Sequence, residues 1–241
     1  MTATAQQGPG RKPGWLGRGL IVYTGPSSLI AARFPTYAQN LRFFLRHGVS
    51  QQCDDKAIAR FDLIVSLSRE TLSHFESELR CAVRAAARCA SSVRVMLRDD
   101  RCYDMETLRL LFHRMPDDLL DSYDALVYLN CGSLGPLLPL RRSSRWPDLG
   151  TITTGRRPAP AEDAPAAAPP PFWALRITRL LSATRRMVGL TINCGGKNGQ
   201  SQAHVGSEGP WAVDREGLRA LRQSSAVFDC RGLDLSSSRG T

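Results

Sequence analysis

The chain has 241 residues, a length that allows one large domain or two small ones. Hydrophobic residues make up 42% and charged residues 22% of it, which excludes a chain that is disordered throughout. No stretch approaches the roughly 18 unbroken apolar residues of a membrane-spanning helix. The basic N-terminus is not followed by the apolar run of a signal peptide, so the sequence by itself predicts a cytoplasmic protein.

The formal net charge is +10, from 32 Lys and Arg against 22 Asp and Glu, and such a charge raises the question of nucleic-acid binding. Only Lys12, Lys56 and Lys197 are lysines, so 29 of the 32 basic residues are arginine. The arginines are spread along the chain and form no single stripe, so we keep nucleic-acid binding as the weakest of three functional alternatives.

Short motifs with a known chemistry are missing. The seven cysteines include no C-x-x-C pair, and no histidine cluster would complete a zinc site. The sequence contains no Walker loop, G-x-G-x-x-G fingerprint, G-x-S-x-G elbow or H-E-x-x-H motif. A functional site must therefore be inferred from where polar residues fall on the predicted fold.

The first half of the chain alternates apolar runs with helical segments. Residues 1–18 form a Gly/Pro-rich basic leader that we expect to be disordered. In chain order there follow a strand at 19–23, a helix from Thr36 to 48, a strand at 61–67, a helix at 69–90, a strand at 93–97, a helix from Asp104 to 116 and a strand at 123–129. Strands that are apolar throughout are typical of parallel sheets covered on both faces. The sequence therefore predicts an α/β fold with a mostly parallel, doubly wound sheet flanked by helices.

A proline-rich stretch interrupts this pattern. Residues 156–171 hold six of the fifteen prolines and read as an extended insertion. Beyond it the sequence predicts a helix at 172–184, strands at 187–192, 211–213 and 227–228, a helix at 215–223 and a frayed tail at 229–241. Because strands and helices resume in the same style, we expect a single domain over residues 19–228.

In doubly wound sheets, ligands bind beyond the carboxyl ends of the strands, where the strand order reverses. One polar segment after a predicted strand contains Arg98, Asp99, Arg101 and Asp104. Its carboxylates could meet the ribose or base of a nucleotide and its arginines a phosphate, or it is a solvated loop with a helix cap.

Two further segments are candidates. Asn130 and Ser133 follow the strand at 123–129 beside two glycines, which either let a ligand approach the backbone or form an ordinary tight turn. His204 could bind a metal or phosphate, or be a surface residue. Asp214 could be a catalytic base, or the N-cap of the helix that follows it.

The order of these segments carries more information than any one of them. YDALVYLNCGSLGPLLP at 123–139, followed by RMVGLTINCGG, HV and WAVDREGLRAL within 186–221, resembles a glycosyltransferase family. The family includes bacterial rhamnan-synthesis-type transferases and plant and algal relatives of unassigned substrate. The resemblance spans residues 19–228 without the insertion, and it implies the nucleotide-diphospho-sugar-binding fold called GT-A.

The resemblance also implies an activity, partners and a location. It implies transfer of a hexosyl or deoxyhexosyl group from a nucleotide sugar to the hydroxyl of a carbohydrate acceptor, in polysaccharide biosynthesis, and a location in the Golgi. Arg98, Arg101 or a metal would offset the charge of the leaving diphosphate. His204 would contact phosphate or metal, and Asp214 would be the base.

Folds of this kind usually hold a divalent cation with an acidic pair where this chain has Asn130-Cys131-Gly132. Mg²⁺ and Mn²⁺ prefer oxygen ligands, and Cys131 is a poor substitute for a carboxylate. The sequence therefore argues against metal dependence. It also keeps open a catalytically inactive, transferase-derived interaction protein as the second functional alternative.

Overall fold

The computed structural model describes residues 17–28, 33–49, 60–88, 91–99, 105–132, 172–189, 192–193, 204–205 and 209–225. The predictions for residues 1–16, for the insertion at 156–171, for a strand at 227–228 and for the tail at 229–241 concern residues outside this part of the chain. None of the helices in the described part is both long enough and apolar enough to cross a membrane.

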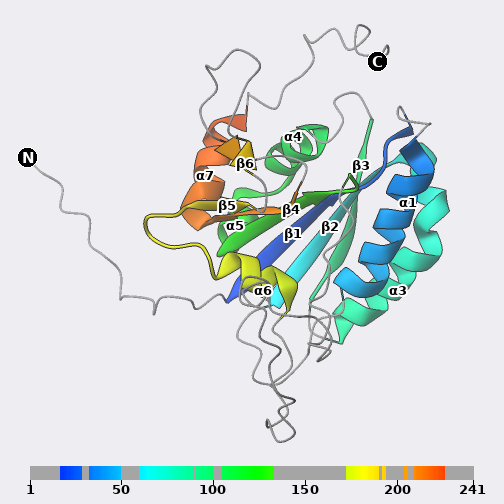
Figure 1. The fold of residues 1–241 in the computed structure, drawn as a ribbon, viewed down its shortest axis with the longest axis horizontal. Coiled ribbons are helices and arrows are strands. Elements are labelled where there is room, and N and C mark those ends of the chain that lie inside the picture. Colours follow the sequence, from blue (N-terminus) through cyan, green and yellow to red (C-terminus); the bar gives the residue numbers. More distant parts are fainter. Residues whose placement is uncertain are drawn as a thin grey trace, which may run out of the picture.

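A six-stranded sheet forms the centre of the described structure (Figure 1). Its strand order is β3-β2-β1-β4-β8-β5. The strands are β1 (Arg18–Thr24), β2 (Arg60–Ser68), β3 (Val93–Arg98), β4 (Ala125–Asn130), β5 (Met187–Gly189) and β8 (Trp211–Asp214). A separate two-stranded sheet consists of β6 (Ile192–Asn193) and β7 (His204–Val205).

The sheet is mixed, which corrects the expectation of a mostly parallel one. The four strands β1 to β4 are parallel to one another, as their predominantly apolar sequences predict. β8 runs antiparallel to both of its neighbours, β4 and β5. The α/β class is thus correct, but the direction of the short strand β8 could not be read from its three apolar residues.

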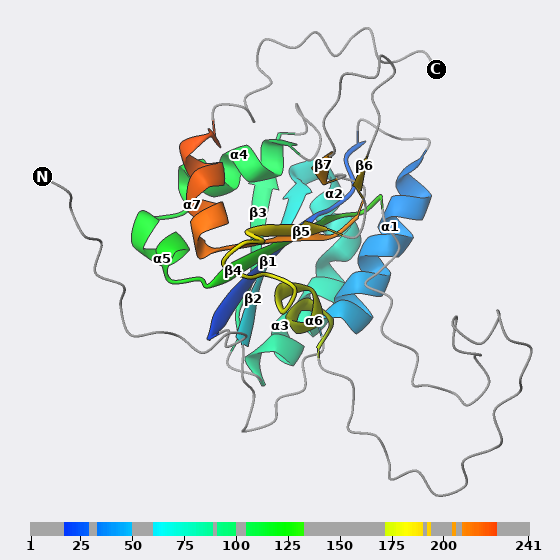
Figure 2. The same cartoon turned by 60° about the vertical axis from the view of Figure 1, so that its left-hand side comes forward.

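Two helical layers cover the sheet (Figures 1 and 2). One face carries α1 (Phe34–Phe43) with the π-helical turn Phe44–Gly48, α3 (Glu76–Ala87) and α6 (Trp173–Thr178). The other carries α4 (Met105–Arg114), α5 (Asp117–Asp121) and α7 (Arg215–Gln223). Each face of the sheet has its own hydrophobic core, and alternate residues of β1 point into one or the other. Ile21 and Tyr23 belong to the core on the side of α1, and Leu20 and Val22 belong to the core on the side of α4.

Strands from both sides of the proline-rich insertion share this sheet. β5 and β8 follow residues 156–171 in sequence, yet β8 pairs with β4, which precedes them. The first strand begins at Arg18, inside the stretch expected to be a disordered leader, because Asp124 binds the backbone N–H groups of Gly17 and Arg18.

Side-chain caps begin two of the helices described here: Ser68 caps α2 (Arg69–Leu72) and Asp214 caps α7. Helix α1 begins at Phe34 and has Pro35 in its first turn, where proline needs no N–H partner, so the predicted N-cap Thr36 lies three residues after the actual N-cap, Arg33. The predicted helix at 69–90 is divided into α2, a 3₁₀ turn at Ser73–Phe75 and α3. Asp104, the predicted cap of α4, lies outside the described residues.

Candidate functional site

The strand order reverses between β1 and β4. From β1 the chain moves outward through β2 to β3, and it then returns to place β4 on the other side of β1. Since β1 to β4 are parallel, their last residues lie at one end of the sheet, called the carboxyl end below; the opposite end is called the amino end. The loops after β1 and β4 leave this carboxyl end side by side, with Thr24 paired to Asn130. This is the position at which doubly wound sheets bind ligands.

Hydrogen bonds hold these two loops together. The N–H of Cys131 donates to the carbonyl oxygen of Thr24 at 2.9 Å, and the side-chain amide of Asn40 donates to the carbonyl oxygen of Cys131 at 2.8 Å. The hydroxyls of Thr24 and Tyr128 share a further buried hydrogen bond of 2.9 Å. Asn40 belongs to α1, so the helix, β1 and β4 fix the loop after β4 together.

Arg98 fixes the loop after β1. Its side chain is buried, and its guanidinium donates to the carbonyl oxygen of Gly25 at 3.0 Å and to that of Ser66 at 3.4 Å. The N–H of Gly25 also donates to Ser66, at 2.9 Å. Arg98 was expected to contact donor phosphate; its contacts make it a residue that positions the loop at Gly25.

Gly25 is required by close packing at this point. A Cβ at this position would lie 2.4 Å from Leu67 Cδ2 and 3.0 Å from the carbonyl oxygen of Ser66. Gly132, in the loop after β4, would place a Cβ near one side chain only, 3.1 Å from Asn130 Oδ1. The loop after β1 therefore lies directly against β2, and the loop after β4 has more open surroundings.

The remaining sequence candidates fall in different places. Asn130 ends β4 at the carboxyl end, and its side-chain oxygen accepts a hydrogen bond from the N–H of Gly132 at 3.0 Å. Asp99 is exposed and follows β3, three strands away from β4, which corresponds to about 14 Å. His204 lies on β7 in the separate two-stranded sheet. Three further candidates lie outside the described residues: Arg101, Asp104 and Ser133.

Asp214 lies at the amino end of the sheet. Because β8 is antiparallel to β4, Asp214 pairs with Ala125, the first residue of β4. Its carboxylate accepts from the N–H of Gly217 at 2.8 Å as the N-cap of α7, and from Arg186 at 2.7 Å. The structure therefore does not bring Asp214 to the loops after β1 and β4, and its contacts are those of a helix cap.

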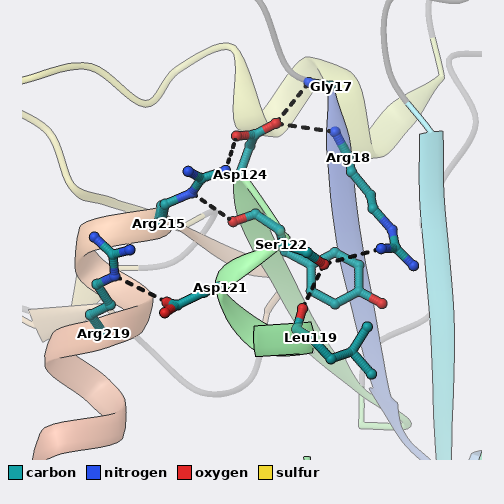
Figure 3. A network of polar contacts seen from close by, with 9 residues as sticks. Gly17, Arg18, Leu119, Asp121, Ser122, Asp124, Arg215 and Arg219 are labelled. Atoms are coloured by element: carbon teal, nitrogen blue, oxygen red, sulfur yellow. Dashed lines mark hydrogen bonds and ion pairs between the residues drawn. The ribbon is translucent and has the colours of Figure 1, made fainter. Parts of the chain in front are cut away.

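Ion pairs join α7 to the segment before β4 at the amino end (Figure 3). Asp124 accepts from Arg215 at 2.6 Å, while its other oxygen accepts from the N–H of Gly17 at 2.9 Å. Arg219 of α7 pairs with Asp121 at 3.0 Å. These contacts fix the start of β1, the end of α5 and α7 relative to one another.

A second network at the amino end centres on Asp62, a charged residue inside the apolar strand β2. It accepts from the N–H and hydroxyl of Ser92 at 2.7 and 2.8 Å, from Arg18 at 2.7 Å and from the hydroxyl of Tyr123 at 3.0 Å. Burial by itself would raise the pKa of Asp62, but these hydrogen bonds outweigh it and lower the pKa below its ordinary value. The sequence offered a signal for this network, because a carboxylate in a buried strand requires partners.

The described residues of the carboxyl end do not fit a divalent cation. Asn130 supplies one amide oxygen, which already accepts from the N–H of Gly132, the hydroxyl of Thr24 is bonded to Tyr128, and Cys131 is a buried thiol. A hard cation needs several oxygen ligands, usually including carboxylates. Within the described ranges, no group of three or more His, Cys, Asp or Glu side chains could hold a metal ion.

A scan against models of known protein families finds none that matches this chain, and a search of curated proteins finds no match either.

Proposed function

We propose that the chain binds a nucleotide sugar over the loops after β1 and β4 and transfers its sugar to an acceptor hydroxyl, as a GT-A-like glycosyltransferase. The observation that carries this proposal is the reversal of strand order between β1 and β4, with both loops fixed by internal hydrogen bonds. The resemblance of residues 123–139 and 186–221 to a glycosyltransferase family supports the choice of ligand class.

The proposal gives the described residues limited and separate roles. Asn130 presents its side-chain amide to the ligand at the end of the sheet where the loops after β1 and β4 begin. Arg98 acts as a positioning residue through Gly25. Asp214 has no part in the reaction, because it lies at the other end of the sheet.

A thermal-shift experiment tests donor binding. The chain is heated with UDP-, GDP- and dTDP-sugars, with and without Mn²⁺; a ligand present at 100 times its Kd should add about 2.7 kcal/mol to the free energy of unfolding. Asn130→Ala should abolish most of the shift, and Ser122→Ala, at the amino end, should retain it. If no nucleotide sugar raises the melting temperature of the wild type, the proposal is wrong.

Donor binding without transfer is a second candidate function. The described residues of the loops after β1 and β4 include no carboxylate that could act as a base, and this favours binding without transfer. Mass spectrometry of the donor decides between the two: a transferase releases nucleoside diphosphate when an acceptor is supplied. A chain that binds donor tightly and releases none is an inactive relative that acts as a binding protein.

A further inference from the structure

An apolar groove of about 390 Å³ lies on the opposite side of the sheet from α1, between strand β3 and helices α4 and α5. Its apolar lining comes from the sheet and from the helical layer of α4 and α5. It includes Ile64, Met96, Leu110, Leu111, Met115 and Leu119. The volume is within the range of sites that bind ligands or peptide side chains.

Three arginines line this groove together with the apolar residues: Arg69, Arg94 and Arg114. No acidic residue is among the described residues that line it. Arg69 and Arg94 are exposed, and neither forms an ion pair with an acid in the described part of the chain. By contrast Arg109, which is also on α4, is paired with Glu106 at 2.6 Å. The groove is therefore both apolar and uniformly cationic.

The groove runs along an edge strand, since within the described sheet β3 has a neighbour on one side only. The carbonyl oxygen of Ser92 accepts from Leu63 on β2. Because backbone groups alternate in direction along a strand, those of Val93 and Val95 point away from β2. Val95 is 41% exposed. The carbonyl oxygen of Leu97 also points away from β2, and it accepts a hydrogen bond from the guanidinium of Arg114 at 3.1 Å.

We propose that this groove binds an extended acidic segment of a partner protein, which pairs as an additional strand with β3. Its backbone would hydrogen-bond to Val93 and Val95, its carboxylates would meet Arg69, Arg94 and Arg114, and its apolar side chains would enter the groove. A second copy of this chain is a poorer occupant, because a symmetric contact would place two sets of arginines against each other. The inference is independent of the proposed transferase function, whose site lies between β1 and β4.

Fluorescence anisotropy with two labelled probe peptides tests this. One probe is a short peptide of the repeat Glu-Ser-Val-Ser, whose glutamates and valines lie on one face of an extended strand, and the other carries lysine in place of every glutamate. We expect saturable binding of the glutamate probe alone, weakened by added salt. Arg94→Glu should weaken binding about tenfold or more, and Arg176→Glu, an exposed arginine of α6 with the same charge change, should leave it unaltered.

A backbone variant tests strand pairing separately. Val95→Pro removes an N–H that points away from β2, so β2–β3 pairing should survive, as circular dichroism can confirm, while peptide binding is lost. The proposal is overturned if Arg94→Glu binds the glutamate probe like the wild type, or if the lysine probe binds equally well. It is also overturned if sodium octanoate displaces the peptide and Val95→Pro still binds, because the groove would then take a small amphipathic anion.

Discussion

Asp214 and Asn130 lie at opposite ends of the sheet, although β8 and β4 are neighbours. Asp214 pairs with the first residue of β4, Ala125, and Asn130 is the last residue of that strand. Asn130 is five residues along the extended strand from Ala125, which corresponds to about 17 Å. A base must lie within hydrogen-bond reach of its substrate proton, so the two residues cannot serve one reaction centre as the chain is folded here.

Asp214 should therefore affect stability and not ligand binding. Asp214→Ala removes the cap of α7 and should lower the free energy of unfolding by about 1 kcal/mol, whereas Asp214→Asn retains a capping oxygen and should lose only a few tenths. Urea denaturation measures both. Neither variant should change the thermal shift produced by a nucleotide sugar; a well-folded Asp214→Asn that no longer binds donor would contradict this assignment.

The fold was largely readable from the sequence, whereas the site was not. Apolar runs predicted β1 to β4 and their parallel arrangement, because buried strands need no polar alternation. Asp214 was recognised as a possible N-cap, and it is one. Its distance from Asn130 follows from the antiparallel direction of β8, and a run of three apolar residues carries no information about direction.

Arg98 illustrates a second limit. Its position at the end of a predicted strand was correct, but whether an arginine side chain turns outward to a phosphate or inward to carbonyl groups depends on neighbouring strands. The carbonyl oxygens it binds belong to Gly25 and Ser66, which are 73 and 32 residues away in sequence. Such contacts follow only from the assembled sheet.

Loss of the Arg98 guanidinium should loosen the loop after β1. Arg98→Met keeps an apolar stem but leaves two buried carbonyl groups without a charged donor, so the free energy of unfolding should fall by about 2 to 3 kcal/mol. Hydrogen exchange should accelerate at residues 24–28 and stay unchanged at 122–125. Arg114→Met, an exposed arginine with one backbone contact, is the matched control. Equal exchange at residues 24–28 in both variants would contradict the positioning role.

Gly25 should tolerate no side chain. Gly25→Ala forces a Cβ against Leu67 Cδ2 at 2.4 Å and should lower the free energy of unfolding by about 1 to 3 kcal/mol. Gly132→Ala meets only the side chain of Asn130, which can rotate, and should be milder. Guanidinium denaturation of the two variants, side by side, provides the measurement. If Gly132→Ala were the more damaging change, the close approach of the β1 loop to β2 would be in doubt.

Asp62 should make the free energy of unfolding depend on pH in the acid range. Its pKa is lowered in the folded protein, so its stabilising contribution is present above the ordinary value of 3.8 and is lost as pH falls through the lowered pKa. Asp62→Asn should therefore be less stable at pH 7 by about 2 to 3 kcal/mol, since one carboxylate accepts from Ser92, Arg18 and Tyr123. The difference from wild type should narrow toward pH 3.

The control for Asp62 is Asp118→Asn, a change at an exposed carboxylate of α5. It should leave stability at pH 7 within about 0.5 kcal/mol of wild type. Urea denaturation at a series of pH values from 3 to 7 compares the three proteins. A constant difference between wild type and Asp62→Asn across this range would show that the charge of Asp62 is not what stabilises the network.

Tyr123 should make the stability of the same network depend on pH in the alkaline range. Burial, and after it the negative charge of Asp62, raise the pKa of Tyr123 to about 12. The proton is held more tightly in the folded than in the unfolded chain, so the contribution of Tyr123 is complete below pH 10 and is lost between pH 10 and about 12. Tyr123→Phe should cost about 1 kcal/mol at pH 8 through the lost hydrogen bond to Asp62, and this difference should shrink as pH rises.

Absorbance titration of tyrosinate gives an independent readout of the same residue. Tyr123→Phe should remove the absorbance change of one tyrosine near pH 12. Tyr37→Phe, on α1 and away from Asp62, should leave that change in place. If both variants kept the full change near pH 12, the hydroxyl of Tyr123 would not be buried against a charged Asp62. The hydrogen bond between these two residues would then not be what connects the segment before β4 to β2.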